Sequence, residues 1–256
     1  MANRIEQQFK DRENQGAVRL NKYLSEAGVC SRREADKLIA QGIVSVDGAP
    51  AACGTKVEPG QTVRIGKKVI SRQEEMVMLV VNKPRGIVCT EERRERDSIV
   101  RFLNYPTRIT YIGRLDKDSE GLLLMTNNGD IINKMMRAGN SHEKEYKVTV
   151  DKEITEEFLE KMAAGVPILD TVTRPCKIEK IGKYKFKIIL TQGLNRQIRR
   201  MCEALGYEVK ELIRLRIMNI ELGKLKPGEY RRVTDEELNE LYELIRDSSN
   251  ETVRWK

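Results

Sequence analysis

Apolar positions near the start of the chain recur at helical spacing and predict two short helices. Leu20, Leu24 and Ala27 fall on one face of the first helix. Ser31 then begins a second helix, and Glu34 follows three residues later. This spacing predicts a capping box, because each of the two side chains can accept a hydrogen bond from the free backbone N–H of the other residue.

In the residues that follow these helices, apolar and polar side chains alternate over short stretches, which predicts short strands. The apolar run at residues 43–46 leads into Asp47-Gly48, which favours a type I′ hairpin because both central residues need positive φ. A second turn at Glu58-Pro59-Gly60 precedes another strand at residues 62–65. The first part of the chain is therefore predicted as two helices followed by short strands.

After a polar stretch at residues 71–75, the pattern changes to longer strands with a few helices between them. The predicted strands cover residues 76–82, 109–112, 122–125, 146–150 and 185–190. The predicted helices cover residues 130–137, 155–164, 196–205 and 235–245. Thr234 and Glu237 form a second capping box before the last helix. Strands and helices do not alternate strictly, so we expect an α+β fold with a largely antiparallel sheet.

These patterns divide the chain into four stretches. They are a disordered arm at residues 1–17, a small helix–helix–strand domain at 18–72, a larger α+β domain at 76–247 and a tail at 248–256. No apolar run approaches the ~20 residues that a membrane span needs. The first residues are polar and carry both signs of charge, unlike a signal peptide. We therefore expect a cytoplasmic protein without a membrane partner.

The inventory of reactive side chains excludes several classes of site. The five cysteines are scattered with no Cys-x-x-Cys pair, which fits reduced thiols better than a disulfide framework or a zinc site. His142 is the single histidine, so a His-based triad or a His-rich metal site is nearly excluded. We expect no metal and no cofactor.

The charge balance points to a polyanionic partner. The chain has a net charge of +8. Residues 18–72 contain 10 basic and 5 acidic side chains, which gives +5 of that total. Candidate phosphate contacts in this stretch are Arg19, Lys22, Arg32, Arg33 and Lys37. Such contacts position a nucleic acid and add salt-dependent affinity without reading its sequence, although an ordinary solvated helix face would also carry these charges.

Three segments of this basic domain match a known module in order and spacing. They are Arg19-Leu20-Asn21-Lys22-Tyr23-Leu24, Cys30-Ser31-Arg32-Arg33-Glu34-Ala35 and Gly42-Ile43-Val44-Ser45-Val46-Asp47-Gly48. Together they closely resemble the S4 RNA-binding domain. The resemblance implies that the first domain binds RNA.

The most unusual segment of the second domain is the charged loop at residues 113–121, which begins Gly113-Arg114-Leu115-Asp116. Its spaced acidic residues mimic the start of an EF-hand calcium loop. However, Asn127 stands where a bidentate Glu is expected, and strands flank the loop where helices should. A solvated turn is the simplest interpretation of the loop alone. The third alternative is a catalytic carboxylate at Asp116, since loops between rigid strands often carry catalytic groups.

Three other segments bear on this choice. They are Asn82-Lys83-Pro84-Arg85-Gly86, His142-Glu143-Lys144-Glu145-Tyr146 and the Arg-rich run at residues 192–201. In that last run, Arg196, Arg199 and Arg200 are predicted to share one helical face, because they stand at positions i, i+3 and i+4. Taken singly, the segments also fit a turn, a strand edge and a solvated basic helix face.

Taken together, the four segments resemble the motifs of pseudouridine synthases of the RsuA/RluB/RluE/RluF family. The match runs from about residue 18 to residue 248. Residues 137–146 look most like the RluF branch, which modifies a uridine of 23S ribosomal RNA. The resemblance implies a pseudouridine synthase catalytic domain behind the S4-like domain. The sister alternative is an RsuA-like synthase acting on 16S ribosomal RNA.

The resemblance also implies roles for individual residues. Asp116 would be the catalytic carboxylate, Tyr146 would stack on the flipped base, and Arg199 would pair with Asp116 and favour its ionised form. Further RNA contacts are expected from Lys83, Arg114, Arg196 and Arg200. The isomerisation needs no cofactor, because it neither changes redox state nor adds an external group. Whether Asp116 attacks as a nucleophile or acts as a base stays open.

The partner expected from this resemblance is ribosomal RNA, with transfer RNA left open as a second substrate. We expect the enzyme to act as a monomer. The rival from another functional class is a non-catalytic, ribosome-associated protein that binds RNA through the S4-like domain alone. A nucleoside hydrolase is remote, because that chemistry calls for a matched second carboxylate.

Overall fold

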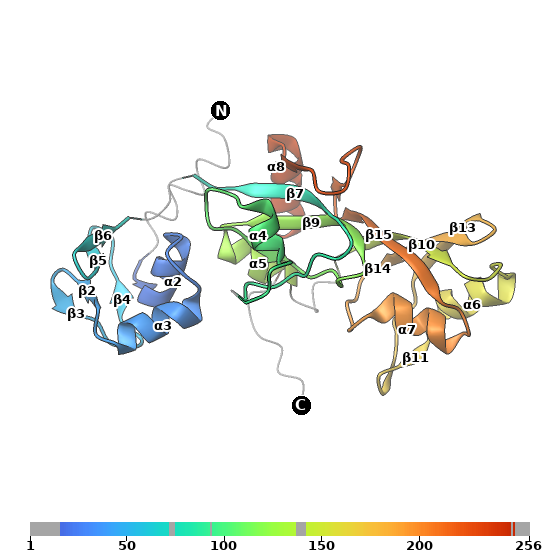
Figure 1. Ribbon diagram of the computed structural model, residues 1–256, viewed down its shortest axis with the longest axis horizontal. Helices are drawn as coiled ribbons and strands as arrows, with labels where there is room; N and C mark the ends of the chain where they lie inside the picture. The colour runs from blue at the N-terminus through green and yellow to red at the C-terminus, as the bar shows by residue number, and fades with distance from the viewer. Residues whose placement is uncertain (1–15, 72–74, 93, 137–141, 247, 249–256) are drawn as a thin grey trace. The chain divides into compact units, whose positions relative to one another are not determined.

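The computed structural model describes residues 16–71, 75–92, 94–136, 142–246 and 248 (Figure 1). The chain divides into two units, of which the first holds the chain up to Val77 together with residues 105–109 and 127–129. The remaining residues form the second unit. Nearly all of the predicted arm at residues 1–17 and of the predicted tail at 248–256 lies outside the described residues.

The two helices of the first unit confirm the predicted capping box. Helix α2 covers Leu20–Glu26 and helix α3 covers Arg32–Ala40. The Oγ of Ser31 accepts a hydrogen bond from the backbone N–H of Glu34 at 3.2 Å. In return, the Glu34 carboxylate accepts one from the N–H of Ser31 at 3.0 Å. Both free N–H groups at the start of α3 are thereby satisfied.

The strands of the first unit are short and form two small sheets. Their bounds are β1 Val18–Arg19, β2 Val44–Val46, β3 Ala49–Pro50, β4 Lys56–Val57, β5 Val63–Ile65 and β6 Lys68–Ile70. Asp47 and Gly48 join β2 to β3 with φ values of 49° and 83°, as the predicted type I′ hairpin requires. Buried Leu24, Ile39 and Val44 belong to one hydrophobic core, so helices and strands of this unit fold around a common centre.

The second unit is built on a nine-stranded sheet with the order β13-β14-β10-β15-β9-β7-β17 (Figure 1). Strand β16 pairs with β15, and β8 pairs with β9. The strand bounds are β7 Met78–Lys83, β8 Thr110–Ile112, β9 Glu120–Thr126, β10 Lys144–Val150, β13 Lys177–Gly182, β14 Lys185–Leu190, β15 Val209–Ile217, β16 Ile220–Glu221 and β17 Tyr230–Arg232. The pairings are antiparallel except that between β15 and β9. The expected α+β fold with a largely antiparallel sheet is confirmed.

The one parallel pairing brings two distant segments together at the centre of the sheet. Arg214 on β15 stands opposite Gly121 on β9. Gly121 has a φ of 108°, and any Cβ at this position would overlap the backbone of Arg214. Glycine is therefore required where the charged loop enters the sheet.

The helices of the second unit agree with the sequence prediction to within one or two residues. Their bounds are α4 Ile99–Leu103, α5 Gly129–Met136, α6 Glu156–Ala164, α7 Gln197–Ala204 and α8 Asp235–Leu244. Helix α4 and the small hairpin of β11 (Pro167–Ile168) and β12 (Thr171–Val172) were not predicted. Within the described residues, no helix has the length and apolar character that a membrane span requires.

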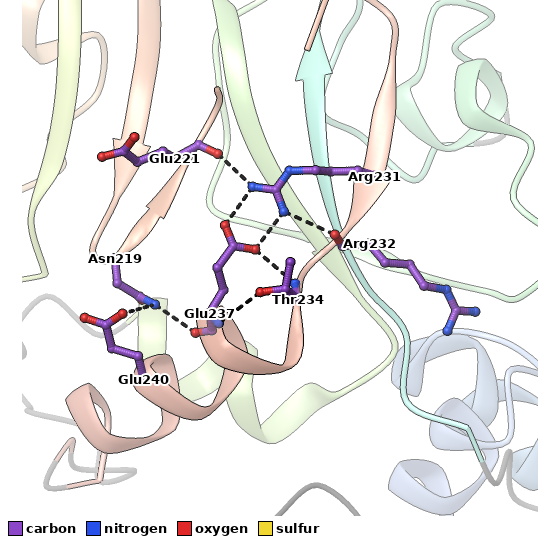
Figure 2. A network of polar contacts seen from close by, with 7 residues as sticks. All are labelled: Asn219, Glu221, Arg231, Arg232, Thr234, Glu237 and Glu240. Carbon is purple, nitrogen blue, oxygen red and sulfur yellow. Dashed lines mark hydrogen bonds and ion pairs between the residues drawn. The ribbon is translucent and has the colours of Figure 1, made fainter. Parts of the chain in front are cut away.

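A polar network holds the start of helix α8 against the sheet (Figure 2). Thr234 and Glu237 form the predicted capping box. The Glu237 carboxylate also accepts two hydrogen bonds from Arg231, each at 2.7 Å. The side-chain amide of Asn219 donates to the Glu237 carbonyl at 2.8 Å. The same glutamate thus caps the helix and ties it to strand β17.

The longest element that the sequence analysis missed is strand β15, at Val209–Ile217, which lies in the middle of the sheet between β10 and β9. Charged residues interrupt its apolar positions. Two of these charges are held by neighbouring strands: Arg216 forms ion pairs with β10 and its flank, and Arg214 donates to a β9 carbonyl.

Candidate active site

The charged loop at residues 113–119 connects β8 to β9 and is anchored from inside. Leu115 is buried, and its N–H donates to the Sγ of buried Cys89 at 3.5 Å. Ser119 is also buried, and its N–H donates to the Asp116 carbonyl at 3.1 Å. Between these two buried residues, the side chain of Asp116 keeps 30% of its surface exposed. The loop therefore presents one carboxylate from a backbone held by two strands.

Two arginines face this carboxylate. The Nη1 of Arg196 lies 3.7 Å from the Oδ2 of Asp116, and the Nε of Arg199 lies 3.9 Å from the same oxygen. Arg199 also binds the loop backbone, since its Nη2 donates to the Asp118 carbonyl at 3.1 Å and to the Ser119 Oγ at 3.3 Å. The structure brings together Asp116 and Arg199, the pair that the sequence motifs implied.

Burial and charge act on Arg199 in opposite directions. Burial lowers the pKa of its guanidinium and the nearby Arg196 charge adds to this, whereas Asp116 and Asp118 oppose the shift. Its side chain is only 13% exposed, against 44% for Arg196. Because a guanidinium stays protonated in proteins, Arg199 supplies a fixed, partly desolvated positive charge beside the carboxylate.

Arg196 reaches Asp116 through an unusual backbone conformation. It is the residue before helix α7, with φ 50° and ψ 35°, in the left-handed region that a non-glycine residue rarely adopts. The prediction that Arg196, Arg199 and Arg200 share one helical face was therefore wrong, because Arg196 lies outside the helix. Arg200 bonds back to Asn195, whose backbone and side-chain oxygens lie 3.1 and 3.3 Å away.

Tyr146 lies on β10, two strands from the charged loop. It stands opposite Arg214 on β15, and Arg214 stands opposite Gly121 at the start of β9. The ring is half-buried against the hydrophobic core of the second unit. The register thus places a partly exposed aromatic side chain across a single strand from the residues that end the loop.

Two family matches cover the S4 domain and the second unit as far as helix α7. Residues 18–70 match the S4 domain, and residues 77–204 match the family described as RNA pseudouridylate synthase. The chain belongs to the RNA pseudouridylate synthase family. It is an RNA-modifying enzyme whose first domain is an S4 domain.

Individual relatives agree with this assignment. The chain is 56% identical over 237 residues to a dual-specificity RNA pseudouridine synthase, RluF, of Escherichia coli K12, covering 92% of this chain and 82% of the relative. It is 34% identical over 247 residues to an uncharacterized RNA pseudouridine synthase of Mycobacterium tuberculosis, covering 92% and 97%. A solved structure of a pseudouridylate synthase superposes with a TM-score of 0.64 at 29% identity, covering 88% of this chain and 99% of that one.

Lys83 of the synthase lies inside the protein, whereas the sequence analysis expected it to contact RNA. Its side chain is fully buried at the end of β7. Its ammonium donates to the carbonyls of Pro84, Ile87 and Lys117, at 2.9, 2.7 and 3.4 Å. Burial lowers the pKa of Lys83, although nearby Asp116 and other acidic groups oppose this. A buried ammonium bound by carbonyls is not available to an RNA phosphate, so we do not retain Lys83 as an RNA contact.

The predicted cations of the S4 domain are mostly exposed. Arg19, Arg32, Arg33 and Lys37 lie on its surface, whereas Lys22 is half-buried and pairs with Glu26 at 3.6 Å. A cavity of about 280 Å³ is lined by residues that include Arg19, Lys22 and Arg32. Three of the five predicted contacts therefore converge on one hollow of the domain.

In the second unit, Arg114 is exposed beside Asp116. No cluster of three or more potential metal ligands occurs within the described residues of the synthase.

Proposed function

We propose that this synthase converts a uridine of 23S ribosomal RNA to pseudouridine, with Asp116 as the catalytic carboxylate. The observation that carries this proposal is the position of Asp116. Its carboxylate is partly exposed and faces two arginines at 3.7 and 3.9 Å, beyond ordinary hydrogen-bonding distance. It is thus held near positive charge while its oxygens stay available to a substrate.

The chemistry requires one ionised carboxylate and no external group. The bond from C1′ of the ribose to N1 of uracil breaks, the base rotates, and C5 bonds to C1′. C5 then loses its proton and N1 gains one, so atoms and electrons balance without a cofactor. Asp116 acts in this sequence either by attacking the ribose or by removing a proton from it. Arg199 stabilises the negative charge of the carboxylate before the reaction.

The target base has to leave its helix to reach Asp116. Flipping a nucleotide costs a few kcal/mol, and stacking on an aromatic side chain returns ~1–3 kcal/mol. In this proposal the half-buried ring of Tyr146 supplies that stacking surface. Phosphate contacts add further affinity through counterion release. The proposed contacts are Arg19, Lys22, Arg32, Arg33 and Lys37 in the S4 domain, with Arg114, Arg196 and Arg200 in the catalytic domain.

The substrate assignment rests on the RluF-like relatives. These relatives are named dual-specificity RNA pseudouridine synthases, and one of them shares 56% identity with this chain. This supports a second RNA substrate beside 23S ribosomal RNA, for which we propose transfer RNA. In this proposal the synthase works in the cytoplasm as a monomer.

Tritium release tests the catalytic assignment directly. Ribosomal RNA carrying tritium at C5 of its uridines loses the label when pseudouridine forms. We expect Asp116→Asn and Asp116→Ala to abolish release. Asp118→Asn, which changes an exposed side chain two residues along the same loop, should retain most of it. Undiminished release by either Asp116 variant would refute the assignment.

The substrate is tested by mapping pseudouridine in cells with and without the protein. We expect one 23S position to lose its modification, together with a position in transfer RNA. A loss confined to 16S ribosomal RNA would refute the proposed substrate but leave the reaction standing.

A further inference from the structure

Three cations from three different elements bind the backbone of the Asp116 loop, and two of them, Lys83 and Arg214, are buried. Arg214 on β15 donates to the carbonyl of Arg114 at 3.5 Å. Lys83 on β7 donates to the Lys117 carbonyl at 3.4 Å, and Arg199 on α7 donates to the Asp118 carbonyl at 3.1 Å. The loop is therefore held on both sides of Asp116. Arg199 belongs to the proposed site, and Lys83 binds carbonyls of the turn that follows it, those of Pro84 and Ile87. The role of Arg214 is therefore the one left to explain.

A β-bulge determines where Arg214 points. On β10, Glu145 stands opposite Arg216 of β15, and the next residue, Tyr146, stands opposite Arg214, so Leu215 has no opposite residue on β10. Residues two apart on a regular strand share a face. The extra residue instead places Arg216 on the face of Glu145 and Arg214 on the face of Tyr146.

The hydrogen bonds agree with this separation of the two arginines. Arg216 forms ion pairs with Glu143 at 3.0 Å and Glu145 at 3.1 Å. The Nε of Arg214 donates instead to the carbonyl of Leu122 at 2.7 Å. Together with its bond to the Arg114 carbonyl, this lets Arg214 bind the chain both before and after the loop. One arginine thus pairs with carboxylates, and the other binds backbone.

The surroundings of Arg214 disfavour a charged side chain, so its contribution to folding stability does not explain its presence. Its side chain is 2% exposed, and its partners among the described residues are carbonyls rather than a carboxylate. Its Nη2 is buried without a hydrogen-bond partner in the described part of the chain. A buried charge without a countercharge normally costs several kcal/mol. An apolar side chain would fill this place more favourably, so the guanidinium calls for a functional explanation.

A second cation lies on the same face. Lys144 precedes Tyr146 by two residues on β10, and burial together with the charge of Arg214 lowers the pKa of Lys144 to about 8. Lys144 can therefore release its proton, whereas a guanidinium cannot. Arg214 is the permanent charge of this pair.

We propose that Arg214 is a positioning residue for the isomerisation. It links the backbone before Asp116 to β15, the strand that pairs with the Tyr146 strand β10. In this way it sets the distance between the carboxylate and the stacked base. This rests on the proposed function of Asp116 and Tyr146. A misplacement of about 1 Å can lower a rate about 10²-fold, so the loss of this link should affect the chemical step more than RNA binding.

The test compares Arg214 with Arg216, a matched arginine on the same strand. Arg214→Met, Arg214→Lys and Arg216→Met are prepared in the full chain, and thermal unfolding checks that each is folded. Tritium release at saturating RNA gives kcat, and RNA binding gives Kd. We expect Arg214→Met to lower kcat by about 10–100-fold while Kd changes by less than about 3-fold. Arg214→Lys, which keeps the charge, should fall between this variant and the wild type, and Arg216→Met should keep its kcat.

Three results would overturn the inference. The first is an Arg214→Met variant with the kcat of the wild type, and the second is an equal loss of kcat in Arg216→Met. If Arg214→Met does not fold, Arg214→Lys decides, and an unchanged kcat in that variant would be the third. A wild-type protein that releases no tritium would instead refute the proposed function, and this inference with it.

Discussion

Two arginine–carboxylate contacts in the catalytic unit use the same residue types with different geometry. At the start of α8, Arg231 binds both oxygens of Glu237 at 2.7 Å, and the N–H of Thr234 adds a third bond at 3.0 Å (Figure 2). At the charged loop, the nearest arginine nitrogens stay 3.7 and 3.9 Å from Asp116. Glu237 uses its oxygens to hold a helix, whereas the oxygens of Asp116 stay beyond hydrogen-bonding distance of both arginines, as our proposal of a catalytic carboxylate requires.

The difference shows how a fold can place positive charge near a carboxylate without forming a hydrogen bond to it. Arg199 is held back from Asp116 because its Nη2 is bound to the Asp118 carbonyl and the Ser119 hydroxyl. Its Nε is buried without a hydrogen-bond partner among the described residues. Arg231 also donates to backbone carbonyls, those of Arg232 at 3.2 Å and Glu221 at 3.1 Å, but the same nitrogens reach Glu237 at 2.7 Å. The incompletely satisfied arginine is thus the one beside the proposed catalytic carboxylate, where a ligand can complete an unmet hydrogen bond.

The largest predicted effect comes from changing the side-chain length of Asp116 and of Glu237 by one methylene each. Asp116→Glu keeps the charge but moves the oxygens, and we expect it to lower the rate of tritium release by about 10²-fold or more. Glu237→Asp, the opposite change in the other contact, should leave that rate within about 2-fold and lower only the melting temperature. An active Asp116→Glu enzyme would show that the position of the carboxylate is not what the loop secures.

The next effect compares how much each of the two arginines near Asp116 contributes to kcat. Arg199→Met removes a nearly buried charge and a support of the loop, and we expect it to lower kcat by about 10²-fold. Arg196→Met removes a more exposed charge and should lower kcat by about 10-fold. Single-turnover rates with labelled RNA measure both. Equal losses of kcat in the two variants would indicate that Arg199 contributes through its charge alone and not through its contacts with the loop.

A third prediction concerns the stability of the α8 contact. Burial alone would raise the pKa of Glu237, but hydrogen bonds from Arg231 and Thr234 outweigh it and lower that pKa below 4.5. The contact therefore stabilises the fold above about pH 4.5 and loses this effect as the pH falls through the lowered pKa. Glu237→Gln should lower the free energy of unfolding at pH 7 by about 1–3 kcal/mol.

Chemical denaturation at a series of pH values measures this difference. The gap between the wild type and Glu237→Gln should close in acid, while kcat stays within about 2-fold at pH 7. A gap that persists unchanged at pH 3 would mean that packing, rather than charge, holds the helix.

The smallest predicted effect lies in the S4 domain, where we propose that exposed arginines contact RNA rather than a carboxylate. In Arg32→Ala with Arg33→Ala, two phosphate contacts are lost, so the slope of log affinity against log salt should flatten by about 1.4–1.8. Affinity at physiological salt should fall a few-fold, with kcat unchanged at saturating RNA. Filter binding across a salt series measures the slope. A slope equal to that of the wild type would exclude this surface from the interface.

Local patterns in the sequence were reliable wherever the deciding contacts are close along the chain. The capping boxes Ser31–Glu34 and Thr234–Glu237 and the Asp47-Gly48 hairpin each depend on residues within three positions, and all three are present. The Val209–Ile217 strand was missed because its charges are held by partners about 70 to 100 residues earlier in the sequence. Periodicity alone cannot show that an arginine will be buried by a strand so far away.

The sequence by itself determined the S4 domain, the α+β fold class, the synthase family and the meeting of Asp116 with Arg199. Its motifs sufficed because each is a short run of residues that can be recognised without knowledge of the tertiary contacts. Only the tertiary structure decided that Lys83 is buried, that Arg196 turns to Asp116 and that Arg214 binds the backbone of the loop. The position of Arg214 depends on the parallel β9–β15 pairing and on the bulge beside Tyr146, which are set by packing among strands far apart in the chain.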